Sequence, residues 1–195
     1  TGLYGGFAAP FTIFAGSTFN IVGDQQMPHN AGNFAVIENF GSFRKTGGSA
    51  ASTVGFSLNN HGLVQAAAGT LAFVAGGRSD GQFDAANTGV VSFSGGTHTM
   101  TNAVSFTASG PGFFRVDNGT FEIATALTMN PSLELAANGV LAGNSNLTCT
   151  STLKWTGGIM QGAGKTIIAP GANLSVSGDG YNKFVFRAID LRGNG

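Results

Sequence analysis

Charged side chains are scarce in this sequence. Of its 195 residues, nine are Lys or Arg and nine are Asp or Glu, so the charged fraction is 9% and the formal net charge is zero. An average soluble domain carries roughly 25% charged residues. Proteins that bind the phosphate backbone of nucleic acids need an excess of Lys and Arg on one face. The composition therefore argues against nucleic acid as a partner.

Cysteine and long apolar runs are lacking too. Cys149 is the single cysteine, so no disulfide can form within the chain. No uninterrupted apolar run reaches the roughly 18 residues that a membrane-spanning helix requires. We therefore predict no membrane span, and we predict that Cys149 is a buried small side chain rather than a reactive thiol.

Glycine and phenylalanine, in contrast, are abundant. The chain has 32 Gly and 17 Phe, and 42% of its residues are hydrophobic, which is not typical of a disordered protein. Gly, Asn and Ser/Thr clusters interrupt almost every stretch of the chain, and each Gly inside a helix costs about 1 kcal/mol. Short alternations of apolar and polar residues, as in 147–155, indicate β-strands. The sequence predicts an all-β protein.

Four segments share one pattern of a strand, an Asn/Gly turn and a second strand, and the spacing from the second segment to the third is longer than the other two spacings. The repeat predicts a parallel β-solenoid (β-helix) with coils of roughly 20 residues. We assign residues 34–195 to these repeats, in roughly eight to ten coils, and residues 1–33 to an irregular N-terminal coil or cap. The four segments are Gly62 to Phe73 (GLVQAAAGTLAF), Gly81 to Phe93 (GQFDAANTGVVSF), Gly112 to Ile123 (GFFRVDNGTFEI) and Ser132 to Gly143 (SLELAANGVLAG).

Aligning the four segments predicts two kinds of column along the solenoid. A structural turn ladder, in which Gly and Asn adopt left-handed backbone conformations, is predicted at Asn87, Gly89, Asn118, Gly119, Asn138 and Gly139. A core stack, in which each buried side chain contributes roughly 1.5 to 3 kcal/mol, is predicted at Leu71, Val91, Phe121, Leu141, Phe73, Phe93 and Ile123. A separate signal, Asn shortly before Gly, recurs at Asn39-Phe40-Gly41 and Asn60-His61-Gly62.

Four polar residues, Gln65, Asp84, Arg115 and Glu134, fall at nearly the same place in successive repeats, so we expect them on one exposed face. One hypothesis makes Asp84 and Glu134 the paired carboxylates of a polysaccharide-active enzyme. The other is a ladder of opposite charges on neighbouring strands, each pair worth roughly 0.2 to 1 kcal/mol. We favour the ladder, because no second cluster of acids or bases accompanies it. The prediction is therefore a protein with no enzymatic activity and no catalytic residues.

The three histidines, His29, His61 and His98, are far apart in the sequence, and none belongs to a recognisable zinc-ligand spacing. We predict no metal site and no cofactor.

Several glycine-rich steps resemble the β-helical repeat regions of large secreted or surface-exposed bacterial proteins, including autotransporter-like and haemagglutinin-like adhesins. The resemblance covers the chain from about Phe34 onward. It implies a secreted or cell-surface location and a structural role. The steps that carry it are Gly69-Thr70-Leu71, Gly119-Thr120-Phe121, Phe93-Ser94-Gly95-Gly96-Thr97, Trp155-Thr156-Gly157-Gly158 and Gly162-Ala163-Gly164.

The expected function is that of an extracellular filament subunit or adhesin stalk that stacks along its axis. Leu191 to Gly195 reads like the opening of another coil, and neither end carries an obvious polar cap. The expected partner is therefore a second copy in a head-to-tail polymer, or the rest of a longer chain. The alternatives are a carbohydrate-binding β-helix module, with surface glycans as partners, and the polysaccharide-active enzyme.

Overall fold

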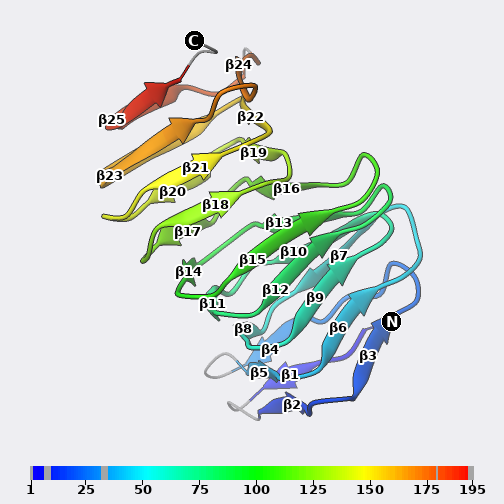
Figure 1. The fold of residues 1–195 in the computed structure, drawn as a ribbon. Coiled ribbons are helices and arrows are strands. Elements are labelled where there is room, and N and C mark those ends of the chain that lie inside the picture. Colours follow the sequence, from blue (N-terminus) through cyan, green and yellow to red (C-terminus); the bar gives the residue numbers. More distant parts are fainter. Residues whose placement is uncertain (1, 7–9, 32–34, 179, 193–195) are drawn as a thin grey trace.

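The computed structural model describes residues 2–6, 10–31, 35–178 and 180–192, and every regular element within these ranges is a β-strand. Three strands make one turn of a spiral, and the strands of successive turns pair in parallel (Figure 1). About eight turns of about 21 residues stack on one another. The predicted all-β parallel β-solenoid is thus confirmed. The described part of the chain has no helix that is long and apolar enough to cross a membrane.

The spiral has three faces, each a column of parallel strands. Face 1 consists of β2 (Phe11–Ile13), β5 (Val36–Asn39), β8 (Ser57–Asn60), β11 (Gly77–Ser79), β14 (Thr97–Met100), β17 (Thr120–Ile123), β20 (Val140–Ala142) and the first halves of β23 (Gly158–Ile168) and β25 (Lys183–Leu191). Face 2 consists of β3 (Thr18–Ile21), β6 (Ser42–Lys45), β9 (Leu63–Ala66), β12 (Gln82–Ala85), β15 (Ser105–Ala108), β18 (Leu127–Met129), β21 (Leu147–Cys149) and the second halves of β23 and β25. Face 3 consists of β7 (Ala51–Val54), β10 (Thr70–Phe73), β13 (Val90–Phe93), β16 (Phe113–Val116), β19 (Leu133–Leu135), β22 (Thr152–Trp155) and β24 (Asn173–Val176).

The pairing corrects the predicted core stack. Leu71 and Val91 are in register on face 3, but the next residue of their column is Phe114. Phe121 and Leu141 are in register on face 1. Phe73 and Phe93 likewise belong to face 3, whereas Ile123 pairs with Met100 on face 1. The predicted residues are all buried, yet they form columns on two faces instead of one common column.

The error comes from the longer spacing between the second and third segments. One full turn of the spiral leads from Val91 to Phe114. The spacing between the two segments exceeds this turn, and the excess carries the chain across one further face. The first two segments therefore span the corner from face 2 to face 3, whereas the last two span the corner from face 3 to face 1. The same pattern of strand, turn and strand therefore occurs at two of the three corners of the spiral.

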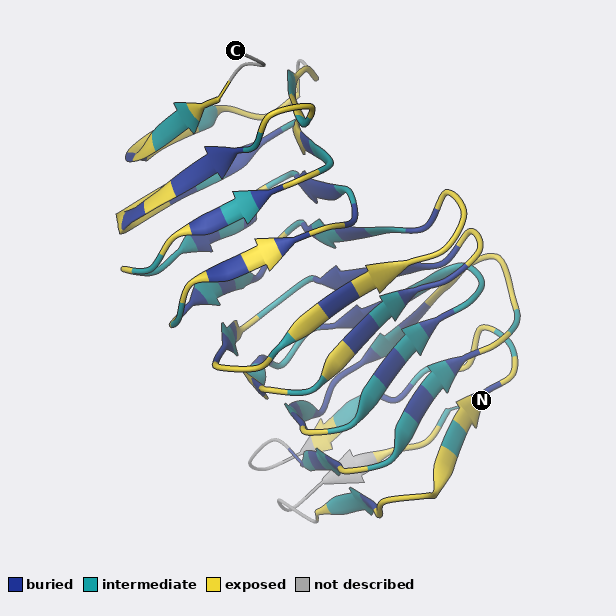
Figure 2. Ribbon diagram, viewed as in Figure 1, coloured by how far each residue is buried: buried dark blue, intermediate teal, exposed yellow. Residues whose placement is uncertain are grey.

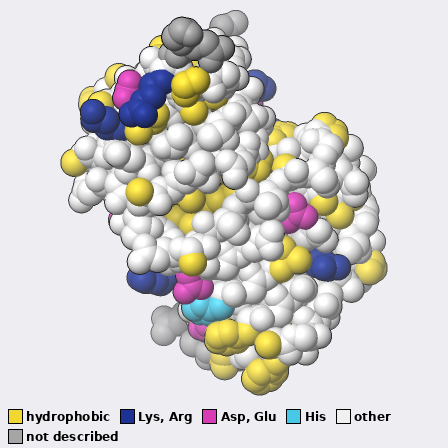
Figure 3. Space-filling view, viewed as in Figure 1, with side chains coloured by type: hydrophobic (Ala, Val, Ile, Leu, Met, Phe, Trp, Pro, Cys, Tyr) yellow, Lys and Arg dark blue, Asp and Glu magenta, His cyan; other side chains and the backbone are white. Residues whose placement is uncertain are grey.

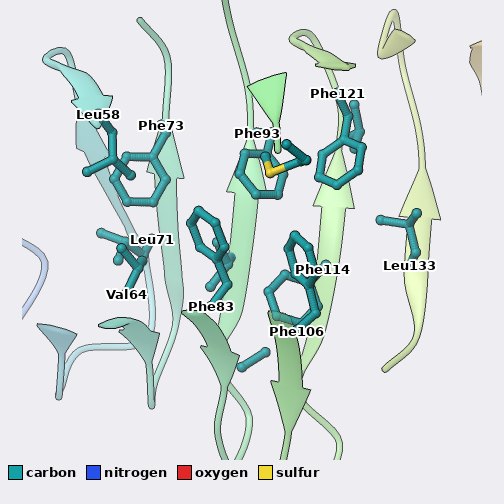
Figure 4. Packing of buried hydrophobic residues seen from close by; sticks show 14 of the residues in the cluster. Leu58, Val64, Leu71, Phe73, Phe83, Phe93, Phe106, Phe114, Phe121 and Leu133 are labelled. Carbon is teal, nitrogen blue, oxygen red and sulfur yellow. The ribbon is translucent and has the colours of Figure 1, made fainter. Parts of the chain in front are cut away.

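Alternation along each strand places one set of side chains inside the solenoid. β16 shows the pattern: Phe114 and Val116 are fully buried, and Phe113 and Arg115 point outward and are partly exposed (Figure 2). Figure 4 shows phenylalanine and leucine side chains from neighbouring strands meeting in the interior. Several rings lie within contact of each other, for example Phe83 and Phe106, whose centroids are 5.3 Å apart. Apolar side chains from successive turns therefore pack against each other in one core.

The parallel stack begins before the predicted boundary. β2 pairs with β5, and β3 pairs with β6, so residues 11–21 already form two faces of a turn. β1 (Gly5–Gly6) pairs with β4 (His29–Ala31) beside this turn. The boundary residue itself, at position 34, lies outside the described residues, as do residues 193–195 in which the next coil was predicted to open.

One ammonium group is buried near the N-terminal end. The Lys45 side chain is in register with Ile21 and Ala66 and is fully buried. Its Nζ donates to the carbonyl oxygens of Gly23 (2.6 Å) and Gly47 (2.7 Å) and to Oδ1 of Asp24 (2.8 Å). These three acceptors match the three N–H bonds of the ammonium, so its burial is compensated.

Face 2 is interrupted once. β15 ends the five-stranded sheet that includes β3, and no backbone hydrogen bond joins it to β18 in the described part of the chain. The corner before β15 has four residues, 101–104, where the equivalent corners of the three preceding turns have two. Ala103 in this corner has a φ of 70°. Faces 1 and 3 continue across the same level through the β14–β17 and β16–β19 pairs.

A buried imidazole sits in the middle of face 1. His98 is 3% exposed and lies between Phe73 and Phe93, with ring centroids 6.5 and 5.0 Å away. Its Nε2 lies 2.9 Å from the carbonyl oxygen of Gly95 and donates to it. Burial lowers the pKa of His98 to about 4, and hydrogen bonds to backbone carbonyls oppose this shift without overcoming it. His98 is therefore neutral in the folded protein at physiological pH.

The corrected register can be checked with two neighbouring phenylalanines. Phe114→Ala should lower the free energy of unfolding by about 3 to 5 kcal/mol, because it empties a fully buried position between Val91 and Leu133. Phe113→Ala, which removes an outward ring from the same strand, should cost about 1 kcal/mol or less. Urea unfolding followed by circular dichroism measures both. Equal losses would contradict the inward position of Phe114.

His98 predicts a pH dependence of stability. The unfolded chain binds a proton at His98 below the ordinary pKa of 6.5, whereas the folded protein does so only near pH 4. The contribution of His98 to the free energy of unfolding is therefore fully present above pH 6.5. It decreases as the pH falls, by about 2 kcal/mol between pH 7.5 and pH 5. His98→Gln should lose this part of the pH dependence in urea unfolding at the two pH values. The same slope in the variant and the unmodified protein would show that another group is responsible.

Candidate functional site

The predicted turn ladder is divided between two corners of the solenoid. Asn87 and Gly89 lie at the corner before face 3, and the other four residues lie at the corner before face 1. Only Asn87 of the six has a positive φ, at 52°. Gly89 and Gly139 are instead pressed against carbonyl oxygens of the preceding turn, those of Ala66 and Val116, where a Cβ would collide. Close approach of backbones, rather than left-handed conformation, accounts for these glycines.

Among the described residues, amide side chains pair with each other between turns at two places. Asn138 Nδ2 lies 3.3 Å from Asn118 Oδ1 at an exposed corner, within the predicted ladder. A stronger pair, which the alignment missed, joins Asn39 Nδ2 to Asn60 Oδ1 at 2.7 Å in the interior. The recurring Asn-x-Gly signal at these two positions was the clue to it. Both pairs join successive turns, and the Asn39–Asn60 pair is buried and closed to a ligand.

The four polar residues predicted on one face lie on two. Asp84 is on face 2, where Gln65 Nε2 donates to its Oδ2 (2.7 Å) and the Thr107 hydroxyl donates to its Oδ1 (2.9 Å). Arg115 and Glu134 are on face 3. Asp84 and Glu134 therefore cannot act together as the carboxylate pair of the enzyme hypothesis. Cross-strand ladders exist on both faces.

The ladder on face 3 has a third member that the alignment did not include. Arg115 Nε lies 2.8 Å from Glu134 Oε2, and Lys154 Nζ lies 3.0 Å from Glu134 Oε1. The three residues follow one another in register on β16, β19 and β22. The Glu134 side chain is 9% exposed, whereas those of Arg115 and Lys154 are 34% and 51% exposed. The result is a buried carboxylate between two accessible cations.

The electrostatics of this ladder keep Glu134 ionised. Burial raises the pKa of the Glu134 carboxyl, but the hydrogen bonds and charges of Lys154 and Arg115 together outweigh it, so its pKa lies below the usual range. A carboxylate held in this way is not a proton donor at neutral pH. With one negative and two positive charges, the ladder carries a net charge of +1.

A surface hollow of about 330 Å³ opens over this ladder. Besides the charged side chains, its walls contain the apolar side chains of Pro111 and Phe113 and the hydroxyls of Ser132 and Thr152. The guanidinium carbon of Arg115 lies 5.2 Å from the centroid of the Phe113 ring, so the ring and Glu134 together fix the Arg115 side chain. Apolar walls with a few converging polar groups are typical of small-ligand sites. We refer to this feature as the face 3 hollow.

The other candidate groups are placed far from this hollow or are inaccessible. Burial raises the pKa of Cys149 to about 12, which keeps it a thiol. His61 lies at an exposed corner, where its ring stacks on Phe40 and its Nδ1 is 2.7 Å from Asp80. Within the described ranges no group of three or more His, Cys, Asp or Glu is placed to hold a metal ion. On the side drawn in Figure 3, charged side chains occur in small, scattered groups among uncharged surface.

Comparison of the chain with protein-family models, with curated proteins and with solved structures gives no match. The fold therefore rests on the geometry of the stack itself. The likeness to bacterial surface repeats rests on the glycine-rich steps of the sequence. The structure itself shows a parallel β-solenoid with a charged hollow on one face.

Proposed function

We propose that the chain is an extracellular structural element, a β-solenoid rod that serves as a filament subunit or adhesin stalk and extends along its axis. Addition takes place at the C-terminal tip, which receives a further β coil. That coil comes from a second copy of the chain or from the rest of a longer chain.

The tip formed by β24 and β25 carries the proposal. Val176, Val185 and Leu191 continue columns whose preceding members, Trp155, Met160 and Ile168, are at most 7% exposed. At the tip the same inward positions are 57%, 50% and 64% exposed. Apolar side chains in core register, with no turn above them in the described part of the chain, favour burial by another coil.

The backbone at this tip is equally suited to pairing. β25 pairs with β23 and β24 pairs with β22, and neither has a second strand neighbour among the described residues. Their outer edges present N–H and C=O groups in the spacing that a further parallel strand would satisfy. β2 and β3 end their sheets in the same way at the opposite tip. A head-to-tail arrangement of copies would join these two kinds of edge.

The extracellular location rests on the resemblance to secreted and cell-surface bacterial repeats. The low charge and the single buried cysteine are compatible with it. The enzyme alternative loses its motivating observation, because the two carboxylates that suggested it lie on different faces.

The tip can be tested with two substitutions on one strand. Val185→Asp places a charge in the apolar end of the core, and we expect it to weaken end-to-end association of the 195-residue chain at least tenfold. Phe186→Asp is the matched control: Phe186 is in register with Gln161, points outward and is already 68% exposed, so association should not change. Sedimentation velocity over a range of concentrations measures association, and electron microscopy shows whether the assemblies are rods.

Thermal melting of both variants checks that the remaining turns stay folded. Two outcomes would contradict axial stacking between copies of the chain. One is an unmodified chain that remains monomeric up to about 1 mM, which corresponds to no more than about 4 kcal/mol of association free energy. The other is an equal effect of the inward and outward substitutions.

A further inference from the structure

Three outward positions of face 3 that precede the hollow are buried. Ala72, Val90 and Ser92 point outward by alternation, yet they are 7%, 8% and 1% exposed. Ala72 and Ser92 are the residues directly before Arg115 in the column that continues as Glu134 and Lys154. The face 3 hollow therefore lies where this column of small side chains gives way to charged ones.

The cations of the hollow keep hydrogen-bonding capacity that the protein does not use. Arg115 donates to Glu134 through Nε, and neither of its Nη atoms has a hydrogen bond to any described group. Lys154 contacts Glu134 through one of its three N–H bonds. Because Glu134 and Phe113 hold Arg115 in place, a ligand would lose little affinity to the ordering of that side chain. The net charge of +1 favours an anion with a single carboxylate at this point.

The rest of the lining has the chemistry of a sugar-binding surface. Phe113 and Pro111 offer apolar area, and the hydroxyls of Ser132 and Thr152 can donate to or accept from ligand hydroxyls. A volume of about 330 Å³ is at the lower end for small-molecule sites. These features suit one pyranose ring that carries a carboxylate.

Two other kinds of ligand fit less well. A peptide strand would need free backbone groups, but β16, β19 and β22 are paired with each other and lie inside the sheet rather than at its edge. A nucleic acid would need more than one net positive charge to replace its counterions.

We propose that the face 3 hollow binds a hexuronate residue of an acidic polysaccharide, with the sugar carboxylate at Arg115 and Lys154 and the ring against Phe113. The site binds and does not cleave: Glu134 is bonded to both cations, and no second carboxylate lines the hollow. The hollow is on the side of the rod, so the inference is independent of axial stacking at the tip.

The experiment is calorimetric titration of the 195-residue chain with trigalacturonate and triglucuronate, with neutral galactotriose as the comparison. We expect at least one acidic trisaccharide to bind, at least tenfold more tightly than galactotriose, and its affinity to decrease as salt is raised. Arg115→Gln and Phe113→Ala should each weaken that binding at least fivefold. Arg78→Gln is the matched control, because Arg78 is an exposed arginine on face 1, away from the hollow.

Melting curves establish that each variant is folded before its affinity is compared. The proposal is overturned if neither acidic trisaccharide binds or if galactotriose binds as tightly. It is equally overturned if Arg115→Gln and Arg78→Gln have the same effect. Tighter binding of a triglutamate peptide than of either sugar would overturn it as well, and would assign the hollow to an acidic protein segment instead.

Discussion

Every feature of this protein depends on the register between one turn of the spiral and the next. Parallel pairing places each residue directly over its counterpart in the preceding turn, so an inward position in one turn meets an inward position in the next. Val91 lies between Leu71 and Phe114 for this reason, and Glu134 lies between Arg115 and Lys154 for the same reason. Core columns and charge ladders are therefore two products of one constraint.

The sequence was sufficient for the fold class and the repeat length, but not for the faces. Glycines at regular intervals and alternating apolar residues predicted a solenoid, because those signals are local. Assigning Phe121 to the column of Leu71 and Val91 failed because a three-sided coil has several corners with the same strand, turn and strand chemistry. These corners can be told apart only by counting the residues of the longer turn that leads from Val91 to Phe114. That turn contains extra corner residues, and its composition does not predict them.

The sequence predicted two of the three charged residues of the face 3 hollow. Arg115 and Glu134 stood at matching positions of neighbouring repeats, and their cross-strand pairing follows from that spacing. Lys154 was missed because the aligned segments ended before it, although it lies one turn after Glu134 within a clear alternation of apolar and polar residues. The burial of Ser92 at an outward position could not be predicted from the sequence, since exposure at such a position depends on neighbours from several turns.

The missing pairing between β15 and β18 divides face 2 into two separate runs of paired strands. Across this level the described turns are joined by strand pairs on two faces, whereas the levels directly before and after it are joined on three, so separating the turns here breaks fewer backbone bonds than at those neighbouring levels. Stacked repeat proteins open first at their weakest interface between neighbouring repeats. A rod made from this chain would therefore open first at this level under mechanical load. Amide hydrogens beside β15 would exchange with solvent before those in the turns on either side.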